Sequence, residues 1–215
     1  MLMILVAIAL PVMSPAGELP KGILLNLDFE HIENGVIPNK TLYPLHVPIG
    51  ELETKIQQDR SVLLFREGQG LVIPHSSLLD PDGSEWIAII RTYAITDGIV
   101  MSQGDDESGY IIFIDHGALR AAIRINGSLH ILQESAASGI TDCRNKWITT
   151  ELRIKPDAAF LSLNRKRAAS IKLPAPLIGT NQRITIGEHQ PSDPKAPASP
   201  NGFTGAISSF KILRQ

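Results

Sequence analysis

The chain has 215 residues, of which 43% are hydrophobic and 20% charged, and its formal net charge at pH 7 is −2. This composition is typical of a folded globular protein and excludes a disordered chain. The balanced charge argues against a nucleic-acid partner or an anionic membrane surface. Aromatic residues make up only 5%, which argues against a broad aromatic platform for sugar rings.

The first sixteen residues are typical of an export signal. The apolar run Leu2–Val12 is too short to span a bilayer of about 30 Å as a helix. Ser14 and Ala16 are small residues at the −3 and −1 positions of a cleavage site after Ala16. We predict a signal peptide at 1–16, one domain at 17–215, and secretion or delivery to the periplasm or cell envelope. The alternatives are a buried N-terminal strand or an uncleaved anchor.

Short apolar runs bounded by Gly, Pro, Asn and Asp recur along the rest of the chain, and helical periodicity is hard to find. About a dozen short strands at near-regular spacing predict an all-β fold, a two-sheet antiparallel β-sandwich or jelly roll. One short helix or turn is expected at Pro74–Asp80, and a Pro-rich surface loop at Pro191–Pro200. The predicted strands are 23–29, 61–67, 70–74, 85–94, 98–103, 110–115, 119–125, 128–134, 146–155, 159–164, 183–188 and 206–213.

One hairpin offers candidate ligand-binding residues. We expect 119–125 to pair with 129–134 across a three-residue loop, so that Arg124 faces His130 and Arg120 faces Glu134. The guanidinium fork of Arg matches a carboxylate or a sulfate. We therefore predict a solvent-accessible binding face for an anionic or hydroxyl-rich ligand. The alternative is a solvated sheet face with an Arg120–Glu134 pair. The candidate residues are Arg120, Arg124 and His130.

The order of segments from Leu63 onward resembles the laminin-G-like, concanavalin-A-like lectin/glucanase superfamily. The segment LLFREGQGLVIPHSSLLDPDGSEWIAIIRTY resembles the opening strands of that family, and KWITTELRI resembles its Trp-led strand. RITIGE and GFTGAISSFKIL resemble its closing signature. The resemblance covers nearly the whole chain after residue 16 and implies two curved antiparallel sheets. It does not imply one activity, because a fold of this kind hosts many functions.

The carboxylates of the sequence do not have the pattern of a glycosidase. Such enzymes on this sandwich carry two carboxylates at strand spacing, as in E-x-D-x-x-E. The sequence contains no such run, and neither G-x-S-x-G nor H-E-x-x-H. We predict a secreted non-catalytic binding module for a carbohydrate or an extracellular protein, with no catalytic residues and no membrane span. The alternatives are a glycoside hydrolase or polysaccharide lyase on the same sandwich, or a structural cell-envelope protein.

The resemblance also implies a structural calcium ion. Asp28 and Glu30 lie two residues apart on a predicted strand, so both side chains point to the same side, together with Asn26. The family often has an Asp pair in the last strand, where this chain has Ser208 and Ser209. This departure from the family pattern argues against a calcium site. Asp28 and Glu30 are the candidate calcium ligands because of their shared side of the strand, with surface carboxylates as the alternative.

Two tryptophans and one cysteine complete the candidates. Trp86 and Trp147 stand where the family places core aromatics, so core packing is predicted for both, with sugar stacking as the alternative. Cys143 is the single cysteine and cannot form an internal disulfide. We expect it to be a small buried residue and not a reactive or intermolecular thiol.

Overall fold

A computed structural model describes residues 21–29, 31–41, 43, 45–57, 60–134, 142–178, 180–188 and 202–215, without the side chains of 133 and 134. The predicted signal peptide at 1–16 and the Pro-rich segment 191–200 lie outside these ranges. The prediction of one domain at 17–215 therefore stays a prediction.

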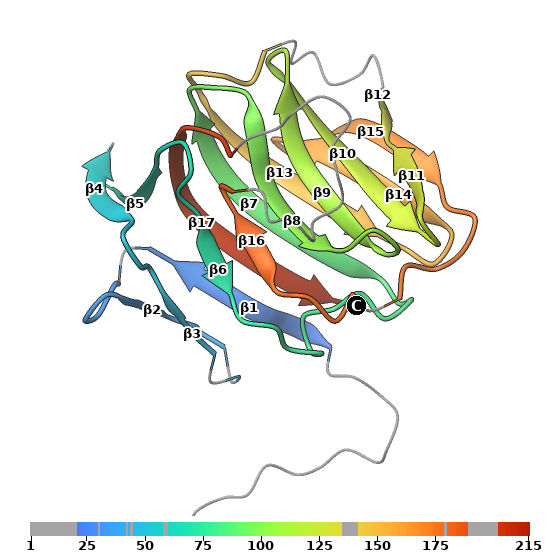
Figure 1. The fold of residues 1–215 in the computed structure, drawn as a ribbon, viewed down its shortest axis with the longest axis horizontal. Helices are drawn as coiled ribbons and strands as arrows, with labels where there is room; N and C mark the ends of the chain where they lie inside the picture. The colour runs from blue at the N-terminus through green and yellow to red at the C-terminus, as the bar shows by residue number, and fades with distance from the viewer. Residues whose placement is uncertain are drawn as a thin grey trace, which may run out of the picture.

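The described residues form a sandwich of two large antiparallel sheets, which confirms the predicted fold class (Figure 1). The larger sheet has nine strands and the smaller has six, and a two-stranded ribbon lies beside them. In the larger sheet the order is β12 (Gln133–Glu134), β15 (Lys166–Lys172), β14 (Ala158–Leu163), β13 (Trp147–Ile154), β7 (Trp86–Ala94), β17 (Gly205–Arg214), β5 (Arg60–Phe65) and β4 (Glu53–Gln57), with β1 (Gly22–Asp28) also paired to β17.

The smaller sheet lies in front of the larger one in Figure 1. Its order is β11 (Ser128–Ile131), β10 (Ala118–Ile125), β9 (Gly109–Asp115), β8 (Gly98–Gly104), β16 (Ile184–Ile186) and β6 (Leu71–Ile73). The ribbon consists of β2 (Val36–Pro38) and β3 (His46–Pro48). The predicted strands did not include β2, β3, β4 or β15.

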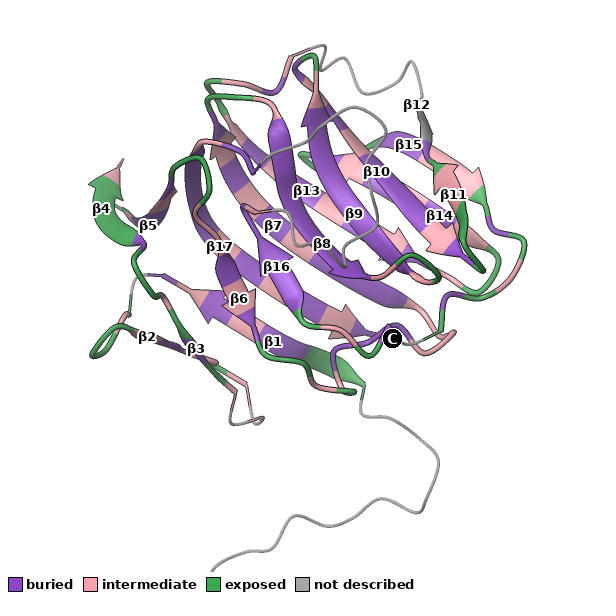
Figure 2. Cartoon of the chain, viewed as in Figure 1, coloured by how far each residue is buried: buried purple, intermediate pink, exposed green. Residues whose placement is uncertain are grey.

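The main hydrophobic core fills the space between the two sheets (Figure 2). Trp86 is fully buried there, and its ring centroid lies 4.8 Å from that of Tyr110 on the opposite sheet. Alternate residues of β7 face this core, because successive side chains of a strand point to opposite faces. The prediction that Trp86 packs in the core is therefore confirmed.

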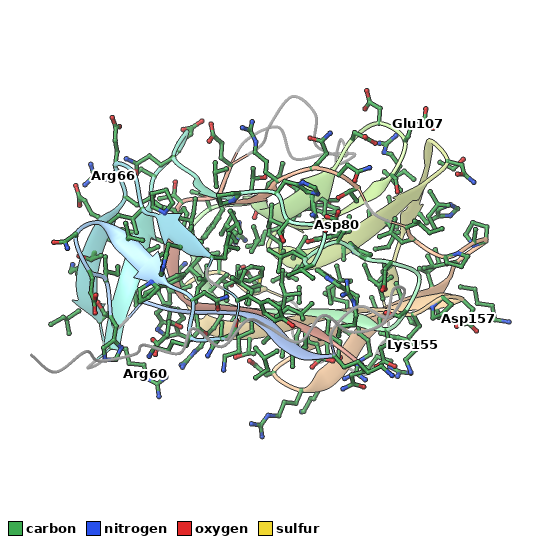
Figure 3. All side chains as sticks on the ribbon, turned by 90° about the horizontal axis from the view of Figure 1, so that it is seen from below. Arg60, Arg66, Asp80, Glu107, Lys155 and Asp157 are labelled. Atoms are coloured by element: carbon green, nitrogen blue, oxygen red, sulfur yellow. The ribbon has the colours of Figure 1, made fainter. Side chains whose placement is uncertain are left out.

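The segment at Pro74–Asp80 is a turn and not a helix. Its backbone carbonyls bind side chains of the sandwich: the indole N–H of Trp86 donates to Leu79, and the buried guanidinium of Arg214 donates to Asp80. The Asp80 carboxylate accepts a 2.7 Å hydrogen bond from Gln103. Figure 3 shows Asp80 between the two layers. These long-range hydrogen bonds satisfy backbone carbonyl groups, which in a helix would accept hydrogen bonds from the helix itself.

The register of the β10–β11 hairpin differs from the predicted register by one residue. Ile125 pairs with Ser128 and Arg124 with Leu129, so the loop is only Asn126-Gly127. Both loop residues have positive φ, 50° and 75°, as a two-residue type I′ turn requires. A slip of one residue moves every side chain of β11 to the other face. The predicted Arg120–Glu134 pair is also wrong, because Glu134 belongs to β12 and pairs with Ala169 in the larger sheet.

Candidate functional site

The outer face of the nine-stranded sheet carries polar, charged and aromatic side chains over β7 and β13. Along β13 the burial alternates, and Ile148, Leu152 and Ile154 are buried in the core. The residues between them therefore point outward. These outward residues are Trp147, Thr149, Glu151 and Arg153.

Trp147 lies on this outer face and is only partly buried, so the prediction that it packs in the core is wrong. It pairs across the sheet with Tyr93, and the two ring centroids are 5.6 Å apart at an interplanar angle of 54°. The Cζ atom of Arg91 lies 5.2 Å from the centroid of the Trp147 ring, within the range of a cation–π contact. We call Arg91, Tyr93 and Trp147 the aromatic cluster.

A shallow pocket opens on the same outer face as the aromatic cluster, over β13, β14 and β15. Its volume is about 330 Å³, near the lower end of the range for small-molecule sites. The Cζ atom of Arg167 lies 4.4 Å from the centroid of the Phe160 ring, so the pocket also combines an arginine with an aromatic ring. We call this cavity the arginine pocket. Its lining is Glu151, Arg153, Lys155, Phe160, Ser162, Arg165 and Arg167.

The arginine pocket is positively charged in a chain whose net charge is negative. Arg153 pairs with Glu85 at 2.7 Å and with Glu151 at 3.1 Å, and Lys155 pairs with Glu85 at 3.0 Å. Within the described ranges, Arg165 and Arg167 have no carboxylate partner. Their charges are therefore available to a ligand that brings hydroxyl or anionic oxygens.

Arg165 stands in a backbone conformation that favours glycine. It forms the β14–β15 turn with Asn164, and the two φ angles are 67° and 49°. Such left-handed conformations are uncommon for residues other than Gly, Asn and Asp. The turn is fixed to β13, because the Asn164 side chain accepts a hydrogen bond of 3.0 Å from the Thr149 amide. The positive φ angles are those that a two-residue type I′ hairpin loop requires.

The structure separates the three residues that the sequence grouped as a binding face. Arg120 and Arg124 point to the outer side of the six-stranded sheet, whereas His130 pairs with Ile123 and shares its core-facing side. Arg120 lies 3.5 Å from Asp115, and Arg124 donates to the carbonyls of Asp106 and Gly127. Ligand binding by these residues stays a prediction, but they do not form one face.

The outer side of the six-stranded sheet is also less open than expected. A second cluster of buried apolar side chains lies there, beside Arg120 and Arg124. Those side chains are at most 1% exposed. The middle of this face is therefore not a solvated surface. The cluster consists of Ile99, Ile111, Phe113 and Ala122.

The predicted calcium ligand Asp28 lies among positively charged side chains. Asp28 points to the outer side of β1, and its carboxylate lies 2.6 Å from the Lys40 ammonium. Glu30 lies outside the described residues. Asp28 borders a pocket of about 300 Å³ that we call the fork pocket, whose other lining residues are Asn26, Arg60, Ser61, Ser208, Ser209 and Lys211.

Ca²⁺ takes six to eight oxygen ligands, several of them carboxylates. In the described part of the chain no group of three His, Cys, Asp or Glu side chains could hold a metal. The single described carboxylate of the fork pocket is already paired, and Arg60 and Lys211 add two positive charges. The described residues of this pocket therefore do not fit a calcium ion.

The sequence contains only part of the information that predicts the aromatic cluster. The outward position of Trp147 follows from Ile148, Leu152 and Ile154, whose alternation puts odd-numbered residues on the other face. Tyr93 and Arg91 occupy the corresponding outward positions of β7. This periodic signal is present in the sequence. The pairing of β13 with β7, which brings the three side chains together, has no local signal.

The sandwich and its sheet order define the chain as a laminin-G-like β-sandwich. The family model for the laminin G domain matches residues 90–215, more than half of the chain. The chain therefore belongs to the laminin G domain family. No curated protein matches it in sequence.

Solved structures with the same fold come from several kinds of protein. The botulinum neurotoxin type G receptor binding domain has a TM-score of 0.60 at 12% identity, covering 89% of this chain and 47% of that one. Domain 4 of the Geobacillus stearothermophilus arabinanase AbnA, in complex with arabinotriose, has a TM-score of 0.63 at 11% identity, with coverages of 91% and 94%. Domains LG4-5 of the mouse laminin alpha1 chain have a TM-score of 0.59 at 10% identity, with coverages of 70% and 40%.

The chain spans about half the length of the neurotoxin chains that it matches. At these identities the likeness establishes the fold, and the family supports a binding module without naming its ligand. In the ranges that the structure covers, no helix has the length and hydropathy needed to cross a membrane.

Proposed function

We propose that this chain is an extracellular binding module that receives a carbohydrate on the outer face of the nine-stranded sheet. The aromatic cluster carries the proposal, because partly exposed aromatic rings present an apolar face and a polar edge to a ligand. The arginine pocket continues the same face and supplies donors for sugar hydroxyl or carboxylate oxygens.

Export is part of the proposal and rests on the pattern of residues 1–16, with secretion or a place in the periplasm or cell envelope as the destination. Among the structures of the same fold, the arabinanase domain is in complex with arabinotriose. Botulinum neurotoxin type C depends on interaction with two ganglioside molecules for cell entry. Both of these proteins support a carbohydrate as the ligand class. An extracellular protein is the alternative partner.

The carboxylates at the arginine pocket favour binding over hydrolysis. A glycosidase needs two carboxylates that flank the scissile bond. On this face Glu85 and Glu151 flank Arg153 and both bind its guanidinium, so a positively charged side chain occupies the position between them. This arrangement supports a binding role for the arginine pocket.

A glycan array with the full chain tests the proposal. We expect selective binding to a subset of glycans, strong loss of binding in Trp147→Ala, and partial retention in Trp147→Phe, which keeps a ring. Exposed Lys55→Ala on β4 serves as a matched surface control. Binding of Trp147→Ala at the wild-type level would contradict the proposed site. Absence of binding to any glycan would favour an extracellular protein as the partner.

A further inference from the structure

The fork pocket lies where β17 changes its neighbour. Gly205–Ile207 of β17 pair with β5, and from Ser209 onward the same edge pairs with β1. Ser208 lies between the two partners, at a register shift of the β17–β7 ladder. Irregular positions of this kind redirect side chains and are frequent beside functional sites.

Two polar atoms of the fork pocket are buried without a partner. The side chain of Ser208 is 7% exposed, and its Oγ has no hydrogen-bond partner among the described residues. The Oδ1 atom of Asn26 is also buried and has no hydrogen-bond partner among the described residues. Buried polar side chains are nearly always hydrogen-bonded, so each exception calls for an explanation. A bound ligand that supplies the missing hydrogen-bond partner is one such explanation.

The charges of the fork pocket favour an anion. Arg60 and Lys211 line it, and within the described ranges neither has a carboxylate within ion-pair distance. Asp28 adds one negative charge, which the Lys40 ammonium balances at 2.6 Å. Figure 3 shows Arg60 pointing away from the sandwich on the side of the nine-stranded sheet. The pocket therefore presents two cations and a hydroxyl donor together.

We propose that the fork pocket binds the carboxylate or sulfate group of an acidic sugar without a metal ion. The guanidinium of Arg60 and the ammonium of Lys211 bind the oxyanion, and the Ser208 hydroxyl donates to it. The Asn26 amide binds a neighbouring sugar hydroxyl. This inference extends the proposed carbohydrate binding to a second site, and it does not depend on the aromatic cluster.

Amide chemical shifts of the full chain test this inference in titrations with glucuronate, glucose, sodium sulfate and calcium chloride. We expect glucuronate and sulfate to shift the amides of Asn26, Ser208 and Ser209 in a saturable way, and glucose and calcium chloride to leave them unchanged. Arg60→Gln and Lys211→Gln should each weaken glucuronate binding about tenfold, the loss expected for one charge-assisted hydrogen bond.

Arg66→Gln is the matched control, because it removes the same charge from a residue that pairs with Glu53 outside the pocket. It should change the affinity by less than about twofold. Ser208→Ala should weaken binding without lowering the melting temperature, since its hydroxyl has no partner in the described part of the chain. Trp147→Ala should bind glucuronate normally, which separates this site from the aromatic cluster. Equal shifts with glucose, equal weakening by Arg66→Gln, or saturable shifts with calcium chloride would overturn the inference.

Discussion

The guanidinium carbon of Arg91 lies 5.2 Å from the ring centroid of Trp147 on the outside of the sandwich, and the Tyr93 ring lies 5.6 Å from the same tryptophan. Arg91 and Tyr93 are outward residues of β7, and Trp147 begins β13. Two adjacent strands thus present one cation and two rings to solvent, and the ring contacts hold Trp147 in one orientation.

The two tryptophans should respond differently to truncation. Trp86→Ala removes a fully buried ring and its contact with Tyr110. We expect a loss of about 3–5 kcal/mol in the free energy of unfolding. Trp147→Ala should cost only about 1–2 kcal/mol, from its aromatic and cation–π contacts. Urea unfolding of both variants checks this, and equal losses would show that Trp147 belongs to the core.

The turn at Arg165 should tolerate glycine. Arg165→Gly relieves the left-handed conformation at φ 67° and should leave the free energy of unfolding unchanged or raise it by up to about 1 kcal/mol. The same change should weaken binding at the arginine pocket. Thermal unfolding and glycan titration measure the two effects. If stability falls while binding is unaffected, Arg165 has no role in the ligand site.

Cys143 should be unreactive in the folded protein. Its side chain is 2% exposed, and its thiol donates to the Gly117 carbonyl at 3.0 Å. Burial and the nearby negative charge of Asp142 raise the pKa of the thiol to about 11. At pH 8 the reactive thiolate is therefore scarce. Labelling with a thiol reagent should be slow in buffer and fast in urea, and fast labelling of the native protein would contradict the described burial.

The ionised Asp142 carboxylate should stabilise the folded protein at neutral pH, and this stabilisation should be lost in acid. The guanidinium and backbone N–H of Arg144 bind its carboxylate and lower the pKa of Asp142 from 3.8 to about 2. A pKa lowered on folding stabilises the protein above the unfolded-state pKa, and this contribution is lost as the pH falls from about 4 to 2. Asp142→Asn should thus be less stable than wild type at pH 6, and the two should converge near pH 2. A difference that does not change with pH would contradict this assignment.

The positions of most strands could be predicted from the sequence because they coincide with short apolar runs bounded by Gly, Pro, Asn and Asp. The runs at 85–94, 98–103 and 146–155 correspond to β7, β8 and β13 within a residue or two at each end. The short strands β2, β3 and β4 lack such a signal. They have three to five residues, and β4 is mostly exposed at the sheet edge.

The ligand-binding residues were harder to predict than the strands, for two different reasons. The Asn126-Gly127 pair is the strongest sequence signal for a two-residue hairpin loop, and a three-residue loop placed His130 on the wrong face. The fork pocket has no local signal at all, because its lining comes from β1, β5 and β17, which lie far apart in the sequence.

Tryptophan fluorescence of the full chain during glycan titration is the most direct measurement of the central claim. Trp86 is fully buried and Trp147 is partly exposed, so a ligand that stacks on the outer face should change the emission of Trp147 alone. We predict a saturable change in emission and protection from acrylamide quenching, both of which vanish in Trp147→Phe. Saturating glycan binding with no change in the emission of Trp147 would contradict the proposed site.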